Sequence, residues 1–242
     1  MITWEDEGIV LAARPHGEAG LIVQLLTRSH GRYAGMVRGG QSARQRGVFQ
    51  PGNMVSAHWS ARLAEHLGSF ACELTGSPFA GLLGEADRLA GLSAAAALCE
   101  AALPERESHR PCYEGLAVLL DALEGPHWAE IYVKWEVALL GELGFGLELT
   151  RCAAGGDSAT LSHVSPKSGC AVSRVAAEPY LSQLIALPPF LVGRGEGGPR
   201  EVAQGLYLTG FFLKRHIFHP QNRDLPPARL RLVEHFGEKE PE

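Results

Sequence analysis

Residues 21–38 read LIVQLLTRSHGRYAGMVR, two short apolar runs joined by the turn sequence Ser29-His30-Gly31. Side chains of a β-strand point alternately to its two faces. The second run follows this alternation, with Tyr33, Gly35 and Val37 on one face and Arg32, Ala34, Met36 and Arg38 on the other. The stretch therefore predicts two neighbouring strands, one of which carries arginine on a single face.

The first 75 residues continue in the same way, as short apolar or alternating segments separated by glycine-marked turns. We expect strands at Ile9–Ala13, Leu21–Leu26, Arg32–Val37, Val55–Ser60 and Gly68–Thr75, and a polar loop at Gly39–Arg46. Five short strands in so small a region are typical of a small barrel, and the five-stranded OB-fold is the leading candidate. Residues 1–78 are thus predicted to form an OB-fold nucleic-acid-binding domain.

The remaining residues, 79–242, are predicted to form an all-helical domain with a small irregular insert at about 150–176. Apolar residues recur at helical spacing, and Pro104 and Gly144 provide stop signals. We expect helices at Ala86–Leu103, Tyr113–Glu124, His127–Leu143, Tyr180–Leu187 and Arg200–Phe218, a partly helical tail after Pro226, and a frayed acidic terminus. The predicted fold class is therefore α+β.

Charge is distributed unevenly along the 242 residues, whose net charge is −5. Residues 81–150 carry four basic and twelve acidic residues, a sum of −8. In contrast, the 46 residues between Glu18 and Glu65 contain no acid. A locally cationic surface on an acidic protein is typical of a site for a polyanion.

This acid-free stretch supplies the candidate DNA-binding residues. Single-strand binding needs positive charge along the phosphates and aromatic faces on which bases stack. The predicted DNA-binding residues are Arg28, Arg32, Arg38, Arg44, Arg46 and Arg62. Tyr33, Phe49 and Trp59 lie near them in sequence, but their spacing favours the barrel core over base stacking for Tyr33 and Trp59.

The insert contains residue types that bind zinc. Cys152, His163 and Cys170 lie in a short segment poor in helix formers. A structural zinc needs four ligands, usually in close C-x-x-C pairs, and no cysteine here has a partner at that spacing. We therefore expect no metal and no other cofactor, and we expect the five scattered cysteines to be mostly buried thiols.

Other function classes find little support in the sequence. It contains no G-x-S-x-G, H-E-x-x-H or P-loop motif, so we expect that the chain is not an enzyme. No run of 18 apolar residues suggests a membrane helix, and the acidic start does not resemble a signal peptide. The expected location is the cytoplasm.

Lys214 and Arg215, near the end of the last long predicted helix, allow two interpretations. Cations at this position stabilise the helix dipole, which is a purely structural role. They also fit a binding site for an acidic peptide or a phosphate.

Two sets of short motifs resemble the bacterial DNA repair protein RecO family. The first set is Gly8-Ile9-Val10-Leu11, Gly17-Glu18-Ala19, Leu25-Leu26-Thr27-Arg28, His30-Gly31 and Val37-Arg38-Gly39. The second is Leu143-Gly144-Phe145-Gly146-Leu147, Arg151-Cys152 and Val164-Ser165-Pro166-Lys167-Ser168-Gly169. Their order and spacing match the family over nearly the whole chain, except that three of the four zinc cysteines of many relatives cannot be placed.

The resemblance implies a recombination mediator that binds single- and double-stranded DNA and anneals complementary strands. With RecR, such a protein helps RecA to load onto DNA coated by single-stranded-DNA-binding protein (SSB). The resemblance also implies that the helical domain receives the acidic, apolar C-terminal tail of SSB, with Lys214 and Arg215 as charge partners. An alternative function is a protein-docking adaptor with incidental DNA affinity, which the acidic middle region favours because it repels DNA.

Overall fold

The computed structural model describes residues 1–237, apart from the side chain of Arg44. The acidic terminus that we expected to fray lies outside the described residues. By their contacts, the residues group into two compact units. The first comprises Met1–Gly125 with Pro226–Arg229, and the second comprises Pro126–Leu225 with the residues from Leu230 onward.

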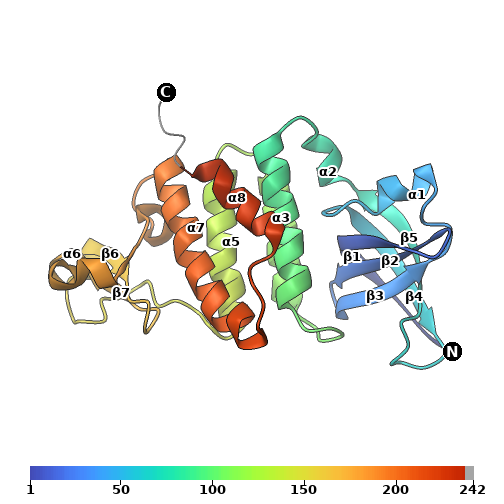
Figure 1. The fold of residues 1–242 in the computed structure, drawn as a ribbon, viewed down its shortest axis with the longest axis horizontal. Coiled ribbons are helices and arrows are strands. Elements are labelled where there is room, and N and C mark those ends of the chain that lie inside the picture. The colour runs from blue at the N-terminus through green and yellow to red at the C-terminus, as the bar shows by residue number, and fades with distance from the viewer. Residues whose placement is uncertain (238–242) are drawn as a thin grey trace. The chain divides into compact units, whose positions relative to one another are not determined.

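The first unit is built on a closed five-stranded barrel (Figure 1). Its strands are β1 (Ile2–His16), β2 (Gly20–Thr27), β3 (Gly31–Val37), β4 (Met54–Ala61) and β5 (Ser69–Gly76). Their order around the barrel is β1-β2-β3-β5-β4, and the helix α1 (Ala43–Val48) lies between β3 and β4 in the chain. The predicted five-stranded OB-like barrel is confirmed.

The barrel consists of a meander, β1-β2-β3, and a hairpin, β4-β5, that are joined along two sides. The joint between β1 and β4 is long and antiparallel, from Ile2 opposite Ala61 to Ile9 opposite Met54. In contrast, the parallel joint between β3 and β5 has one register pair in the described chain, Met36 opposite Ser69. Here the Met36 N–H donates to the Gly68 carbonyl at 3.0 Å.

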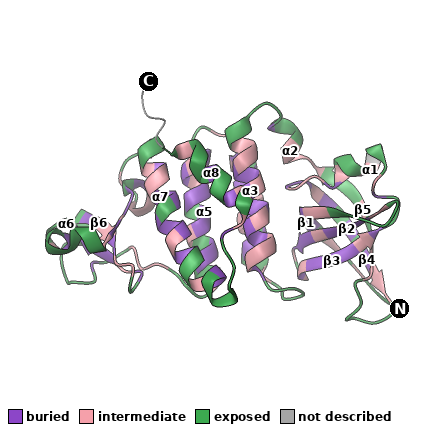
Figure 2. Cartoon of the chain, in the orientation of Figure 1, coloured by how far each residue is buried: buried purple, intermediate pink, exposed green. Residues whose placement is uncertain are grey.

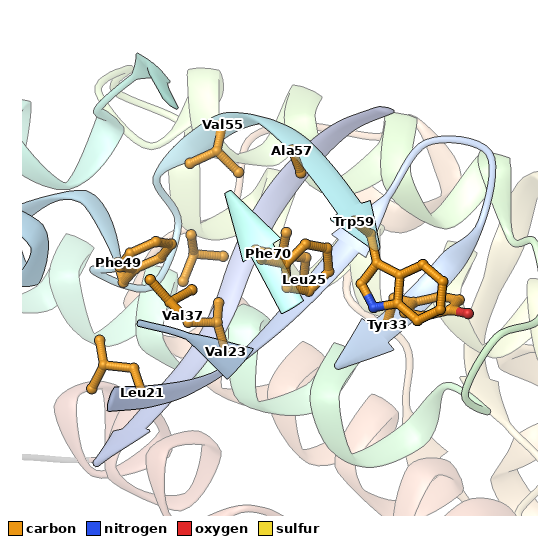
Figure 3. Packing of buried hydrophobic residues seen from close by; sticks show 11 residues of the cluster. Leu21, Val23, Leu25, Tyr33, Val37, Phe49, Val55, Ala57, Trp59 and Phe70 are labelled. Atoms are coloured by element: carbon orange, nitrogen blue, oxygen red, sulfur yellow. The ribbon is translucent and has the colours of Figure 1, made fainter. Parts of the chain in front are cut away.

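Inward-pointing side chains fill the barrel, as the alternation of the sequence predicts (Figure 3). Trp59 lies beside Tyr33 at one end of this core, and Phe49, which follows α1, lies at the other end. Trp59 is fully buried and Tyr33 is 7% exposed. The prediction that these two rings belong to the core is therefore confirmed.

Two elements of the barrel differ from the sequence prediction. Residues 39–46 were expected to form a loop, but α1 begins at Ala43 because the Ser42 side chain accepts a hydrogen bond from the Gln45 N–H. The first strand is also longer than predicted. Its acidic start, Glu5-Asp6-Glu7, pairs with β4 although it is poor in strand-forming residues, because that partner lies about fifty residues later in the chain.

Three helices follow the barrel in the first unit: α2 (Pro78–Gly81), α3 (Ala86–Ala102) and α4 (Arg110–Ala122). The long helix α3 packs against β1 and β2, and α4 contacts β2. Figure 2 shows buried residues along α3. Their contacts therefore place these helices in the same compact unit as the barrel. The sequence instead predicts that the barrel domain ends at residue 78.

The second unit contains the remaining helices and the insert. Its longest helices are α5 (Trp128–Glu142) and α7 (Pro199–Leu213), which pack against each other, and α7 continues as a π-helical segment, Lys214–Phe218. Between α5 and α7 lie β6 (Leu161–Val164), β7 (Ala171–Ser173), α6 (Arg174–Ala177) and β8 (Ile185–Ala186). The C-terminal helix is α8 (Pro227–Phe236), of which Pro227–Arg229 belong to the first unit and the rest to the second. Among residues 1–237, no helix has the length and apolar character that a membrane crossing requires.

The prediction of a helix at Tyr180–Leu187 is wrong. This segment contains the end of a 3-10 turn, Glu178–Gln183, followed by β8. Ile185 and Ala186 pair with β6, so their backbone hydrogen bonds are made in a three-stranded sheet, ordered β7-β6-β8. Pairing with a distant strand outweighs the weak helical pattern of so short a segment.

We predict that Gly68→Ala destabilises the barrel. Gly68 has a φ of +67°, and a Cβ atom there would lie 2.4 Å from the Trp59 indole. The free energy of unfolding should fall by more than about 1 kcal/mol, because both the backbone conformation and the core packing oppose a side chain. Urea unfolding measures the change.

The matched control is Gly47→Ala, in α1, where φ is ordinary and no atom lies within 4 Å of the added Cβ. This variant should be as stable as the original chain or slightly more stable. Equal stability of the two variants would show that Gly68 is not required for closure of the barrel.

Candidate nucleic-acid interface

A groove of about 510 Å³ opens on the outside of the barrel, where β3 and β5 meet. We call it the seam groove. It is lined by Met36, Val37, Arg38, Gln45, Ser60, Ser69, Phe70, Ala71 and Cys72. None of these lining residues is acidic. A groove on an OB-fold that carries a cation and no carboxylate is suited to a nucleic-acid strand.

The local structure places one cation, Arg38, in the lining of this groove. Arg38 follows the last residue of β3, and α1 begins a few residues later, at Ala43. The intervening loop is held by Gln41, whose side-chain amide donates to the carbonyls of Gly17 at 3.1 Å and Gly20 at 2.9 Å. Gln45 on α1 lines the groove, and Arg46 is the next residue of this helix, which is largely exposed (Figure 2).

Three of the six predicted arginines are exposed and form no ion pair within the described part of the chain. They are Arg38, Arg46 and Arg62. Arg62 begins the connection between β4 and β5, two residues after Ser60 of the seam groove. The side chain of Arg44 lies outside the described part of the structure, although its backbone belongs to α1 rather than to the predicted loop.

Arg28 and Arg32 have carboxylate partners. Arg28 pairs with Glu7 at 3.1 Å and with Glu114 of α4 at 3.7 Å. Arg32 is only 15% exposed; it pairs with Glu105 at 3.1 Å, and its Nε donates to the Leu103 carbonyl at 2.7 Å. The acid-free stretch of sequence is therefore not acid-free in space, because other segments bring carboxylates to it.

A group of side chains that the sequence did not indicate lies at the Trp59 end of the barrel core. Trp4 stacks on the His30 ring, with centroids 4.1 Å apart, and Asp6 accepts a hydrogen bond from His30 Nδ1 at 2.9 Å. The signal in the sequence was Trp4 within an otherwise acidic start. The position of Trp4 beside the barrel core becomes clear only from the pairing of β1 with β4, which puts Trp4 opposite Trp59.

In the second unit, Lys214 and Arg215 are exposed but already have partners. Lys214 pairs with Asp224 at 3.0 Å, and this hydrogen bond and charge hold the pKa of the Asp224 carboxyl below its usual value. Arg215 donates to the Pro166 carbonyl at 2.7 Å. These contacts test neither the helix-dipole role nor peptide binding, and both stay predictions.

The same unit has a groove of about 730 Å³ that the sequence did not indicate. We call it the α7–α8 groove. It is lined by Ala186, Pro199, Arg200, Ala203, Gln204, Tyr207, His235, Phe236 and Gly237. Tyr207 is 66% exposed, so a large aromatic surface lies open beside the cationic Arg200.

In the insert, Cys152 is buried and its sulfur accepts a hydrogen bond from the Ser173 N–H at 3.2 Å. Burial raises the pKa of this thiol, but hydrogen bonds from the side chain and backbone of Ser173, and from the backbone of Ala154 and Gly156, lower it to about 7. Cys170 instead contacts the Ser168 carbonyl at 3.6 Å. Among residues 1–237, no three His, Cys, Asp or Glu side chains converge on a possible metal position.

Models of two protein domains match the chain. The model described as "Recombination protein O N terminal" matches residues 1–77, and "Recombination protein O C terminal" matches residues 83–225. The chain belongs to the RecO family. The resemblance inferred from the short motifs is thus confirmed, and family membership supports a role in DNA repair and recombination.

Curated relatives share this family membership over nearly their full length. The DNA repair protein RecO of Rhodospirillum centenum is 55% identical over 235 residues, covering 96% of this chain and 94% of the relative. The RecO protein of Rhodospirillum rubrum is 50% identical over 242 residues, covering 97% and 96% of the two chains. That of Phenylobacterium zucineum is 50% identical over 238 residues, covering 97% and 98%.

The hydrogen bonds to Cys152 predict a pH-dependent contribution to stability. The folded pKa is about 7, below the ordinary thiol value of 9.0, so the folded chain favours the thiolate. This contribution is fully present above the unfolded pKa and is lost as the pH falls through about 7. The stability advantage of the original chain over Cys152→Ser should therefore grow from pH 6 to pH 9.

Urea unfolding of both chains across this pH range measures the difference. Taking the difference cancels the titration of groups that the two chains share. An advantage that does not change with pH would show that Cys152 remains a neutral thiol.

Proposed function

We propose that this chain is a recombination mediator that binds single- and double-stranded DNA and anneals complementary strands. Membership of the RecO family supports a role in repair. The observation that carries the proposal is the seam groove, where Arg38 lies among lining residues that include no carboxylate. Arg46 and Arg62 extend its positive charge along α1 and the β4–β5 connection.

Annealing by this surface needs no covalent chemistry. Two complementary strands repel each other through their phosphates, and clustered arginines reduce that repulsion when both strands bind. The arginines keep their charge at any physiological pH, so the surface stays cationic. The proposed activity therefore assigns no catalytic residue and no cofactor.

The resemblance to RecO further leads us to propose that the chain acts with RecR and helps RecA to load onto DNA coated by SSB. An acidic, apolar tail such as that of SSB needs apolar surface beside a cation. The α7–α8 groove offers Tyr207 and Phe236 beside Arg200. We propose it as the site for the tail, with Lys214 and Arg215 as the second candidate.

The α7–α8 groove also favours the alternative function, a docking adaptor in a repair complex. Its exposed aromatic surface suits a peptide. A separate argument is that residues 81–150 carry twelve acidic and four basic residues, so the surface that they form opposes DNA binding. The two functions are compatible, because the seam groove and the α7–α8 groove share no residue.

We predict that the double variant Arg38→Ala/Arg46→Ala binds oligo-dT more weakly at low salt and anneals complementary strands more slowly. Each lost phosphate contact should reduce the log–log slope of affinity against salt by about 0.7. Fluorescence anisotropy at several salt concentrations gives the slope, and an annealing assay with and without SSB gives the rate.

A control with the same change in charge is Arg14→Ala/Arg110→Ala. Both arginines are exposed but paired, Arg14 with Glu100 at 2.5 Å and Arg110 with Glu114 at 2.8 Å. This variant should keep most of the affinity and the slope. If the two double variants weaken binding equally, net charge rather than the seam groove determines DNA affinity.

We predict that Arg200→Ala/Tyr207→Ala weakens binding of a peptide with the sequence of the SSB tail by roughly ten-fold, the effect expected for removing a central aromatic or arginine contact. Lys214→Ala/Arg215→Ala should have a smaller effect. Titration of a labelled peptide compares the two variants. The opposite order would place the tail near Lys214 and Arg215 instead.

A further inference from the structure

A second depression, of about 570 Å³, lies on the first unit next to the β2–β3 turn. We call it the aromatic pocket. Four of its lining residues carry aromatic rings, Trp4, His30, Tyr33 and Trp59, and Arg106 contributes a guanidinium group. Ser29 and Ser108 supply polar groups beside the rings, and Glu65 supplies a carboxyl group.

The rings form a ladder that leads from the barrel core to the surface. The Trp4 and Trp59 rings are stacked with centroids 5.6 Å apart, and the Trp4 and His30 rings are stacked at 4.1 Å. Tyr33 contacts the edges of both tryptophans. Trp59 is fully buried, whereas the His30 side chain is 36% exposed, so the outer end of the ladder is open to a ligand.

His30 is held in place before any ligand arrives. Asp6, a nearly buried carboxylate, accepts hydrogen bonds from His30 Nδ1 at 2.9 Å and from the Ser29 N–H at 2.8 Å. Burial raises the pKa of the Asp6 carboxyl, but the hydrogen bonds outweigh burial and hold its pKa below the usual value. A ring fixed in this way loses little conformational entropy when it binds a flat partner.

Arg106 forms one wall of the pocket. Its guanidinium lies 4.9 Å from the centroid of the Tyr33 ring, and it donates to the His66 carbonyl at 2.7 Å and to the Ala64 carbonyl. These bonds fix the β4–β5 connection beside the rings. Arg106 also has a φ of +62°, which a residue with a side chain rarely adopts. This strained backbone places a cation beside aromatic rings.

Flat aromatic surfaces, a cation and polar groups at the rim together match a nucleobase, which stacks through its faces and forms hydrogen bonds through its edges. The β4–β5 connection links this pocket to the seam groove. Ser60 lines the seam groove, Ala64 lines the aromatic pocket, and Arg62 lies between them in the chain. A strand whose phosphates follow Arg38 and Arg62 would thus bring a base to the rings.

We propose that the aromatic pocket binds one unstacked base of a single-stranded nucleic acid, against the Trp4–His30 pair. This inference rests on the proposed function, because it assumes that a strand lies on the barrel. It adds a contact that the arginines cannot provide, since phosphates are the same in a duplex and in a single strand, whereas only an unpaired base has its faces free.

The experiment compares oligo-dT with an abasic strand of the same length, which has the phosphates but no bases. Fluorescence anisotropy measures the affinity of the full chain for each. The original chain should prefer oligo-dT by at least about five-fold, which corresponds to the lower end of the stacking free energy of one base. His30→Ala should remove most of this preference by weakening oligo-dT binding alone.

Two further variants separate stacking from folding. His30→Phe keeps an aromatic ring and should restore the preference even though it cannot bind Asp6 as histidine does. His16→Ala removes an exposed histidine at the far end of β1 and should leave both affinities unchanged. A preference that survives His30→Ala, or that His30→Phe does not restore, overturns the proposal.

The outcomes distinguish this inference from the proposed function. Arg38→Ala/Arg46→Ala should weaken binding of both strands by the same factor and leave the preference intact. Equal affinity of the original chain for both strands, with weaker binding by the arginine variant, overturns the base site and supports the seam groove. Absence of binding to either strand overturns the proposed DNA binding itself.

Discussion

The barrel depends on how β3 and β5 meet. One parallel register pair and the hydrogen bond from the Met36 N–H to the Gly68 carbonyl close the cylinder there, over the fully buried Trp59. The seam groove lies where these two strands meet and is lined by residues of both, with Gln45 of α1 and Ser60 of β4. The contact that completes the core thus also lies at the surface that we propose for DNA.

Electrostatics divides the arginines of the barrel into two groups. Arg28 and Arg32 meet carboxylates from β1 and from the segments around α3 and α4, and Arg32 is mostly removed from water. Such pairs contribute little to the attraction of a polyanion because their charge is already compensated. Arg38, Arg46 and Arg62 remain uncompensated within the described residues, so these three, unlike Arg28 and Arg32, keep their charge available to a polyanion.

Local sequence patterns correctly predicted features that depend on neighbouring residues, such as the two faces of a strand. They failed for contacts between segments that are far apart in the chain. The alternation in Arg32–Val37 correctly placed Tyr33 in the core and Arg38 on the outside. The pattern could not show that Glu105 reaches Arg32, because these residues are far apart in the chain. For the same reason it missed the pairing of β8 with β6 and the stack of His30 on Trp4. The cap at Ser42 is, in contrast, a local signal, since Ser42 stands directly before the helix that it starts.

The two unequal joints of the barrel also have a consequence for how it folds and opens. The meander and the β4–β5 hairpin form from contacts between neighbouring segments, which arise quickly, whereas each joint must close a long loop. Once both are made, the β1–β4 joint, with eight register pairs, should resist rupture more than the β3–β5 joint, which has one register pair in the described chain. Transient local opening should therefore begin at Met36, so the amide protons there exchange with solvent sooner than those of β1.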